Sequence, residues 1–300
     1  MKPLGGTELL YNNLIKYCGQ DWQQYVNLII SVCNSSNIDT KKKNILWQHL
    51  SYDQAAVSGM QDFKFTSAID SFVYVSDWQL LQFKLRFDID HLNNYVIKNA
   101  IPSIEYKEKP TDKIRLIYTS MPNRGLEVLI DAFKILNRTD VELIVYSSNI
   151  IYGAGYANSV NHDYLFHKCK TTPGVTYKGY ATNKAIRTAV QSAHILTYPS
   201  IFEETSCLAA IEAGAAGCKI LTTDFGALTE TCDKWATYVT YDSNHSRLAE
   251  NYAEVLANTI DNYSAANYNL VDQSLWFNQQ YSWENRAKEW AKFFGDLCVK

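Results

Sequence analysis

Three glutamates near the start of one expected helix are the residues best placed to do chemistry. Glu203 and Glu204 lie in a loop that follows the apolar run His194–Ser200, and Glu212 comes eight positions after Glu204 in an alanine-rich segment. Carboxylates accept hydrogen bonds from hydroxyl groups, so such a pair could bind a sugar or a ribose. The same acids could instead complement the positive end of a helix dipole, with Glu212 on the surface. Spacing alone leaves both interpretations open.

The segment around these acids predicts a strand, a loop, a helix and a second strand. Apolar residues recur with a helical period from about residue 206 to residue 216. Thr205 or Ser206 is the expected N-cap, and Gly217 is expected to end the helix. The first amides of this helix would point at the carboxyl end of the sheet, where open α/β folds bind ligands and where a helix N-terminus favours phosphate. Since acids repel phosphate, glutamates that belong to such a site are expected to bind the hydroxyl groups of a sugar or a ribose.

Composition excludes several classes of protein. The chain has 300 residues and a net charge of −3, so one large or two ordinary domains are expected, without a basic footprint for nucleic acid. Its seven cysteines are odd in number and contain no C-x-x-C pair, which argues against a disulfide framework or zinc site and fits a cytoplasmic protein. No apolar run reaches the roughly 18 residues of a transmembrane helix, while peripheral contact with a membrane stays open.

Short β-branched and aromatic runs alternate with amphipathic segments of helical length. This alternation predicts β-α-β units with parallel sheets, and hence an α/β fold of two Rossmann-like domains whose sheets face across a cleft. A polar segment at 103–113, which contains Pro110, separates the two patterns. We expect strands at 26–32, 44–49, 72–76, 114–120, 141–147, 175–180, 194–200 and 219–223, and helices at 5–17, 77–87, 125–136 and 183–193.

The segment FEETSCLAAIEAGAAGCKILTTDFGALTE resembles the signature of the retaining nucleotide-sugar glycosyltransferases of the large group-1 family (family 4), which have the GT-B fold. That signature holds two glutamates separated by seven residues, then small residues, a glycine, a strand and a Gly-Ala or Gly-Gly loop. Glu204 and Glu212 match the pair. The resemblance implies that Glu204 lies near the donor sugar, that Glu212 binds the ribose hydroxyls, and that backbone amides of Thr205–Cys207 hold the diphosphate. Glu203 is then a bystander.

Arg124 and Gly125 match the basic residue and glycine that open a helix in the family's second domain. The resemblance implies that Arg124 neutralises charge on the leaving diphosphate, the usual role of an arginine in phosphate chemistry. An exposed loop arginine is the alternative. Many members carry a further arginine just after the preceding strand, where this chain has Thr119–Met121. The second cation is therefore absent or differently supplied.

Other matches fall in the first hundred residues. Gly5 and Gly6 match the family's glycine loop, where backbone can approach a phosphate or sugar closely. His49 matches a histidine at a strand end and is the candidate for contact with the donor sugar or acceptor hydroxyl, although such a histidine is often purely structural. Family members have a strand ahead of the glycine loop. Only four residues precede Gly5, so we expect that strand to be absent, which would leave a gap in the sheet or force a rearranged order.

The resemblance also implies the division of the chain. Residues 1–107 would form an abbreviated acceptor-side domain and residues 108–282 the nucleotide-sugar domain. The terminal segment 283–300 would be a helix that packs back toward the first domain. One stripe of that helix is apolar and must be buried against something; it consists of Trp283, Ala287, Trp290, Phe294 and Leu297.

The function implied is hexosyl transfer, with retention, from a nucleotide-diphosphate sugar to the hydroxyl of a carbohydrate, lipid-linked or protein acceptor. No metal and no cofactor is expected, and the leaving phosphate would assist a front-face displacement. Two alternatives stay open: a nucleotide-sugar epimerase of the same fold, and a truncated, non-catalytic scaffold that binds nucleotide-sugar or a partner protein. A weaker rival is the Asp-x-Asp tripeptide at 88–90, a pattern that holds a divalent cation in other transferases.

Overall fold

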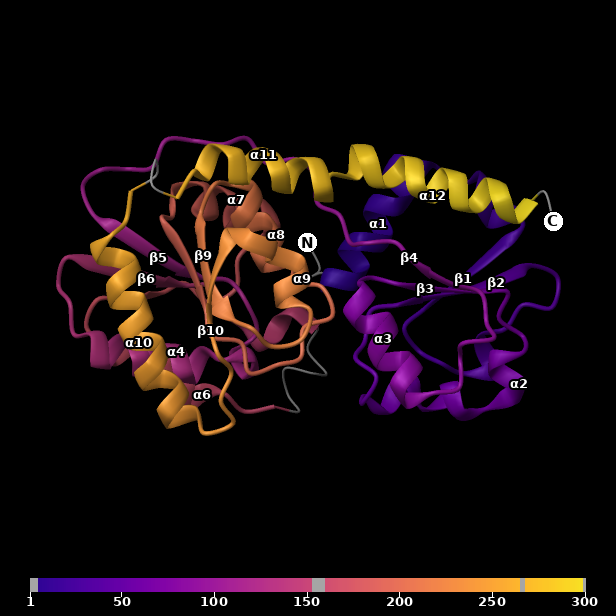
Figure 1. Ribbon diagram of the computed structural model, residues 1–300, viewed down its shortest axis with the longest axis horizontal. Coiled ribbons are helices and arrows are strands. Elements are labelled where there is room, and N and C mark those ends of the chain that lie inside the picture. The colour runs from indigo at the N-terminus through magenta and orange to yellow at the C-terminus, as the bar shows by residue number, and fades with distance from the viewer. Residues whose placement is uncertain (1–4, 153–159, 265–267, 299–300) are drawn as a thin grey trace. The chain divides into compact units, whose positions relative to one another are not determined.

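The computed structural model describes residues 5–152, 160–264 and 268–298, and the chain in it forms two compact units (Figure 1). Unit 1 comprises the described residues up to Gly6 together with Ser103–Glu203 and Cys207–Gln280. Unit 2 comprises Thr7–Pro102, Glu204–Ser206 and the chain from Tyr281 onward. Each unit is built on a parallel sheet, one of four strands and one of six. The predicted α/β fold with two Rossmann-like parallel sheets is confirmed.

The four strands of unit 2 are hydrogen-bonded in chain order, β1-β2-β3-β4, and every pairing is parallel. Each strand pairs directly with the next, so the described sheet has no gap. A gap was one of the two arrangements expected from the absence of a strand ahead of the glycine loop. The strands are β1 (Val26–Ile30), β2 (Lys43–Gln48), β3 (Ser71–Tyr74) and β4 (Asn94–Val96), and the helices are α1 (Gly6–Cys18), α2 (Phe63–Thr66), α3 (Asp77–Arg86) and α12 (Trp283–Cys298), with 3-10 turns at Asp21–Gln24, Ser35–Asn37 and Ala55–Gln61.

Both faces of this sheet are covered. Because neighbouring residues of a strand point to opposite faces, Leu46 and Trp47 of β2 enter different cores. Leu46 joins the apolar cluster that includes Phe65 of α2 and Phe83 of α3. Trp47 packs edge-on against Trp290 of α12, with ring centres 4.9 Å apart. Three residues of the expected apolar stripe of the terminal helix are buried within unit 2, namely Trp283, Trp290 and Phe294.

The six strands of unit 1 are also all parallel, in the order β10-β9-β8-β5-β6-β7. Figure 1 shows α4, α6 and α10 on one side of this sheet and α7 and α8 on the other. The strands are β5 (Ile114–Tyr118), β6 (Val141–Val145), β7 (Val175–Tyr177), β8 (Ile195–Tyr198), β9 (Lys219–Thr223) and β10 (Ala236–Val239), and the helices are α4 (Leu126–Leu136), α6 (Asp163–Thr171), α7 (Asn183–Ser192), α8 (Leu208–Ala215), α9 (Leu228–Cys232), α10 (His245–Asp261) and α11 (Leu270–Tyr281), with 3-10 turns η4 (Pro122–Arg124), η5 (Asn149–Tyr152) and η6 (Asp233–Trp235).

The strand order of unit 1 reverses between β5 and β8. From β5 the chain builds the sheet outward through β6 and β7, and from β8 it builds in the other direction through β9 and β10. The loops that follow β5 and β8 therefore leave neighbouring strands at the same edge and diverge. Such a switch point, at the carboxyl ends of the strands, is where open α/β sheets bind ligands. Arg124 follows β5 and the three glutamates follow β8.

Two helix ends test the expected capping. Gly217 has φ of +67°, and the amide of Cys218 donates to the Ala213 carbonyl at 2.9 Å, so the expected glycine stop of α8 is confirmed. In α3, Asp77 opens the predicted helix 77–87 but is not its N-cap. Ser76 holds that position instead, and its Oγ accepts a hydrogen bond from the amide of Gln79. Asp77 becomes the first helical residue, where its charge complements the helix dipole.

Gly125 sits where the loops after β5 and β8 come closest. Its φ is +110°, a conformation that side chains rarely adopt. A β-carbon at this position would lie 1.9 Å from the carbonyl oxygen of Pro199, which follows β8. Both the backbone conformation and the contact therefore require a residue without a side chain.

We predict that Gly125→Ala lowers the free energy of unfolding by well over 2 kcal/mol, because it adds a backbone clash to a left-handed strain of roughly 1–2 kcal/mol. Urea denaturation followed by circular dichroism measures this change. Gly179→Ala is the matched control in unit 1: φ there is +67°, but an added β-carbon would meet only ordinary contacts of 3.8–3.9 Å with Tyr177. Equal losses in the two variants would contradict the role given to the Pro199 contact.

Candidate functional site

Arg124 is held beside the loop that follows β8. It ends the 3-10 turn η4 directly after β5, and its guanidinium carbon lies 4.2 Å from the ring centre of Phe202. A cation over an aromatic face is attracted by the ring quadrupole. Together with the approach of Gly125 to Pro199, this contact joins the two loops of the switch point. Arg124 is partly exposed.

The start of α8 differs from the expected cap. The helix begins at Leu208, its N-cap is Cys207, and no side chain caps it, so the prediction of Thr205 or Ser206 as N-cap is wrong. Thr205 is engaged elsewhere, because its Oγ1 donates to the His49 carbonyl at 2.9 Å within unit 2. A thiol is a weak acceptor, so the first amides of α8 lack the hydroxyl cap that the sequence suggested.

The two adjacent glutamates have different surroundings. Glu204 is 4% exposed, whereas Glu203 is only partly buried. A buried carboxylate is costly unless other groups bind it, so its position is defined more closely than that of a surface acid. Of the two, Glu204 is the more deeply buried, in the short loop ahead of α8.

Glu212 lies on α8 and forms an ion pair with Arg187 of α7. The Arg187 Nε donates to Glu212 Oε1 at 3.0 Å, and the two side chains are 24% and 14% exposed. Burial raises the pKa of Glu212, and the charge and hydrogen bond of Arg187 oppose that shift. Sequence analysis missed Arg187, because it lies 25 positions from Glu212 on another helix and no local spacing connects them.

His49 lies just beyond the end of β2, in unit 2. Its ring centre is 4.4 Å from that of Trp47, and its Nε2 is buried without a hydrogen bond to any described residue. Burial lowers the pKa of His49 to about 3, so the imidazole is neutral at physiological pH. It can offer one donor and one acceptor to a substrate but no positive charge. The Thr205 hydrogen bond joins its backbone to the loop that holds Glu204.

The glycines at the start of α1 lie against α8. Gly5 is buried, and α1 begins at Gly6. A β-carbon on Gly6 would come within 3.2 Å of Leu208 Cδ1, at the first residue of α8. A small residue is therefore favoured there, and the structure brings this predicted glycine to the helix start that we expected to hold the diphosphate.

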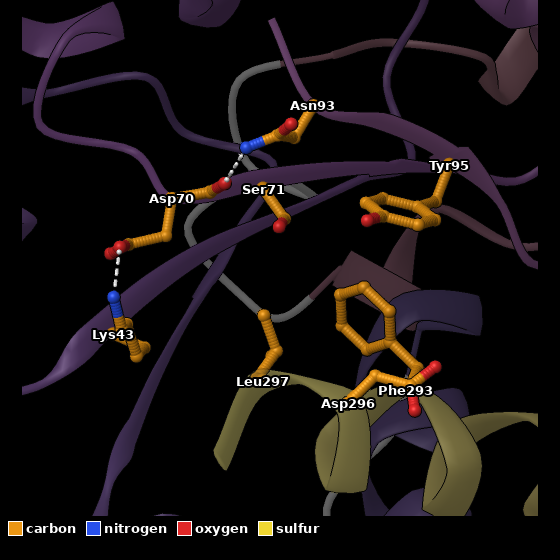
Figure 2. A pocket seen from close by; sticks show the side chains of 8 residues that line it. All are labelled: Lys43, Asp70, Ser71, Asn93, Tyr95, Phe293, Asp296 and Leu297. Atoms are coloured by element: carbon orange, nitrogen blue, oxygen red, sulfur yellow. Dashed lines mark hydrogen bonds and ion pairs between the residues drawn. The ribbon is translucent and has the colours of Figure 1, made fainter. Parts of the chain in front are cut away.

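A pocket of 110 Å³ in unit 2 has none of these residues in its lining (Figure 2). It is found at the amino ends of β2, β3 and β4, the edge opposite to the one that parallel sheets use for ligands. Lys43 pairs with Asp70 at 2.9 Å, an interaction marked by a dashed line in Figure 2, and none of the predicted site residues lines the pocket. The lining residues are Lys43, Asp70, Ser71, Asn93, Tyr95, Phe293, Asp296 and Leu297.

The Asp-x-Asp rival has no support in its surroundings. The side chains of Asp88 and Asp90 are 98% and 76% exposed, and they pair with His91 and Lys84. Among the residues that the structure describes, no three His, Cys, Asp or Glu side chains gather as a metal site would need. In the same described part of the chain, no helix has both the length and the apolar character needed to cross a membrane.

Solved structures with the same fold are numerous, and three represent them. A chain of the GtfA/B complex aligns with 98% of this chain over 61% of its own length, at 16% identity and a TM-score of 0.67. A glycosyltransferase from Rickettsia africae aligns with 98% of this chain over 82% of its own length, at 14% identity and 0.67. Alr3699/HepE from Anabaena, in complex with UDP-glucose, aligns with 85% of this chain over 73% of its own length, at 14% identity and 0.70.

At these identities the likeness shows the fold, which is that of the GT-B glycosyltransferases. No curated protein sequence matches the chain significantly. The family model described as "Glycosyl transferases group 1" matches residues 103–270, more than half of the chain and almost all of unit 1. The chain therefore belongs to the group 1 glycosyl transferases.

Proposed function

We propose that this protein is a retaining glycosyltransferase that moves a hexose from a nucleotide-diphosphate sugar to an acceptor hydroxyl. One observation carries the proposal: at the switch point of unit 1, Arg124 lies beside the loop after β8, and that loop leads to a helix start without a side-chain cap. A fixed cation beside a helix N-terminus is an arrangement that favours an anionic diphosphate.

The diphosphate would bind at the start of α8 and at Arg124. The amides around Thr205, Ser206 and Cys207 supply donors, and Gly5 and Gly6 leave room for the backbone to approach the donor. Charge grows on the leaving diphosphate as the glycosidic bond to it breaks, and a preorganised arginine stabilises that charge. Arg124 would therefore act on the reaction rate as well as on binding.

The sugar and the ribose would be bound by the two glutamates. Glu204, buried ahead of α8, would accept hydrogen bonds from the sugar hydroxyls and fix the orientation of the ring. Glu212 would accept from the ribose hydroxyls. His49, which is neutral because burial lowers its pKa to about 3, would contact the reacting face of the sugar or the acceptor hydroxyl.

Retention would follow from displacement on one face of the sugar. No described side chain is arranged as an obvious nucleophile, so we propose that the leaving phosphate takes the proton of the acceptor hydroxyl as the new bond forms. The scheme uses Arg124 and helix amides for charge stabilisation and calls for no metal. A uridine diphosphate sugar is the first donor to test, since Alr3699/HepE was solved with UDP-glucose.

A thermal-shift screen with UDP, GDP and ADP tests the binding half of the proposal. At a concentration about a hundredfold above Kd, one of these ligands is expected to stabilise the protein by roughly 2.7 kcal/mol, or a few degrees in the melting temperature. Arg124→Ala should lose most of that shift, whereas Arg247→Ala, which removes an exposed arginine paired with Asp242, should keep it. No shift with any of the three nucleotides would count against a nucleotide site.

Turnover of the donor tests the catalytic half. With the sugar derivative of whichever nucleotide binds, Glu204→Ala is expected to slow release of the nucleoside diphosphate by about a hundredfold or more, since it removes a group that acts on the reacting sugar. Glu203→Ala is the matched neighbour and should remain near the wild-type rate. Equal losses in the two variants, or none in Glu204→Ala, would reject the site assignment.

A further inference from the structure

We propose that Arg187 is a positioning residue, which keeps the Glu212 carboxylate charged and fixed in direction so that it can receive the ribose of the donor nucleotide. The inference rests on the proposed function, because it extends the role of Glu212 there. It adds a residue on a different helix that no motif identifies.

Arg187 binds one oxygen of the Glu212 carboxylate, which leaves the other oxygen for the ligand. Arg187 Nε donates to Oε1 at 3.0 Å, and the side chain of Glu212 is 14% exposed. A carboxylate held through one oxygen cannot rotate freely, so the direction of Oε2 is fixed by α7 as well as by α8. An acceptor with a fixed direction loses less entropy when a hydroxyl binds to it.

Electrostatics make the same arginine necessary for the charge. Burial raises the pKa of Glu212, and Arg187 is the charged group that counteracts this effect. Without Arg187 a larger share of Glu212 would be protonated near neutral pH, and one oxygen would become a donor. Of the charged side chains of unit 1 on elements packed against α8, Arg187 is the one bonded to Glu212; the others are Lys184 of α7, Lys219 of β9, Glu230 of α9 and Asp272 of α11.

Two lysines close to this helix, one partly exposed and one buried, cannot replace Arg187 without breaking other bonds. Lys109 donates to the carbonyls of Gln191 and Ala216, and Lys219 donates to the carbonyl of Trp235. Each of these ammonium groups satisfies a backbone acceptor. The loss of the arginine is therefore expected to leave Glu212 without a positive charge bonded to it.

Three variants separate positioning from a merely structural role. Arg187→Met keeps most of the side-chain volume and removes the charge, Arg187→Lys restores the charge without the planar fork, and Arg247→Met removes an exposed arginine of the same unit. A fourth variant, Glu212→Gln, removes the carboxylate itself. It identifies the NMR signal of Glu212 and has no charge for Arg187 to maintain.

The first measurement needs no ligand. Carbon-13 NMR of the glutamate carboxyls, with the Glu212 signal identified by its loss in Glu212→Gln, gives the titration midpoint. We expect the midpoint to rise in Arg187→Met, to return toward the wild-type value in Arg187→Lys and to stay unchanged in Arg247→Met. An unchanged midpoint in Arg187→Met would overturn the proposal, whether or not the protein binds nucleotide.

The second measurement is the Kd of UDP and of 2′-deoxy-UDP by calorimetry between pH 5.5 and 8.5. Arg187→Met should weaken UDP binding at pH 7 by about tenfold, the effect of losing one charge-assisted hydrogen bond, and more at pH 5.5. Its preference for UDP over the deoxy nucleotide should shrink by the same factor. In the Glu212→Gln background the substitution should change neither quantity.

The outcomes distinguish the two proposals. If wild-type protein binds UDP but Arg187→Met binds it equally well at every pH, the inference fails and the proposed function stands. If wild-type protein binds neither UDP, GDP nor ADP, the proposed function fails, and the ribose-binding role of Glu212 fails with it. The NMR titration still decides whether Arg187 keeps Glu212 charged.

Discussion

The contact between Gly125 and the Pro199 carbonyl is the constraint on which the candidate site depends. It brings the loop after β5 to within van der Waals distance of the loop after β8, at the one point of the sheet where the strand order reverses. That approach sets the position of Arg124 over Phe202 and the path of the backbone from β8 into α8. A side chain at Gly125 would separate the loops, and the cation and the helix start would no longer share one edge.

Burial then decides how each acid and base of the site can act. Glu204 is almost fully buried, Glu212 is buried against Arg187, and the ring of His49 is neutral because burial lowers its pKa to about 3. Burying these groups costs desolvation free energy, and the interactions with their partners offset only part of it. Their burial therefore indicates a role in a site more than a contribution to the stability of the fold.

The sequence predicted the fold because its hydrophobic pattern is local. Runs such as Lys219–Thr223 form strands where they were expected, and Gly217 ends α8 because only a left-handed residue completes that turn. The cap of α8 was mispredicted, since Thr205 bonds a residue 156 positions away and propensity does not include that partner. Arg187 was missed for the same reason: its role exists only once α7 and α8 pack together.

The central claim is that the switch point of unit 1 binds the diphosphate of a nucleotide. The most direct measurement is a crystal structure of the protein with UDP. We predict that the phosphates lie at the first amides of α8 and at the Arg124 guanidinium, with the ribose hydroxyls at Glu212. A nucleotide at the amino ends of β2–β4, in the pocket lined by Lys43 and Asp70, or phosphates turned away from α8, would contradict it.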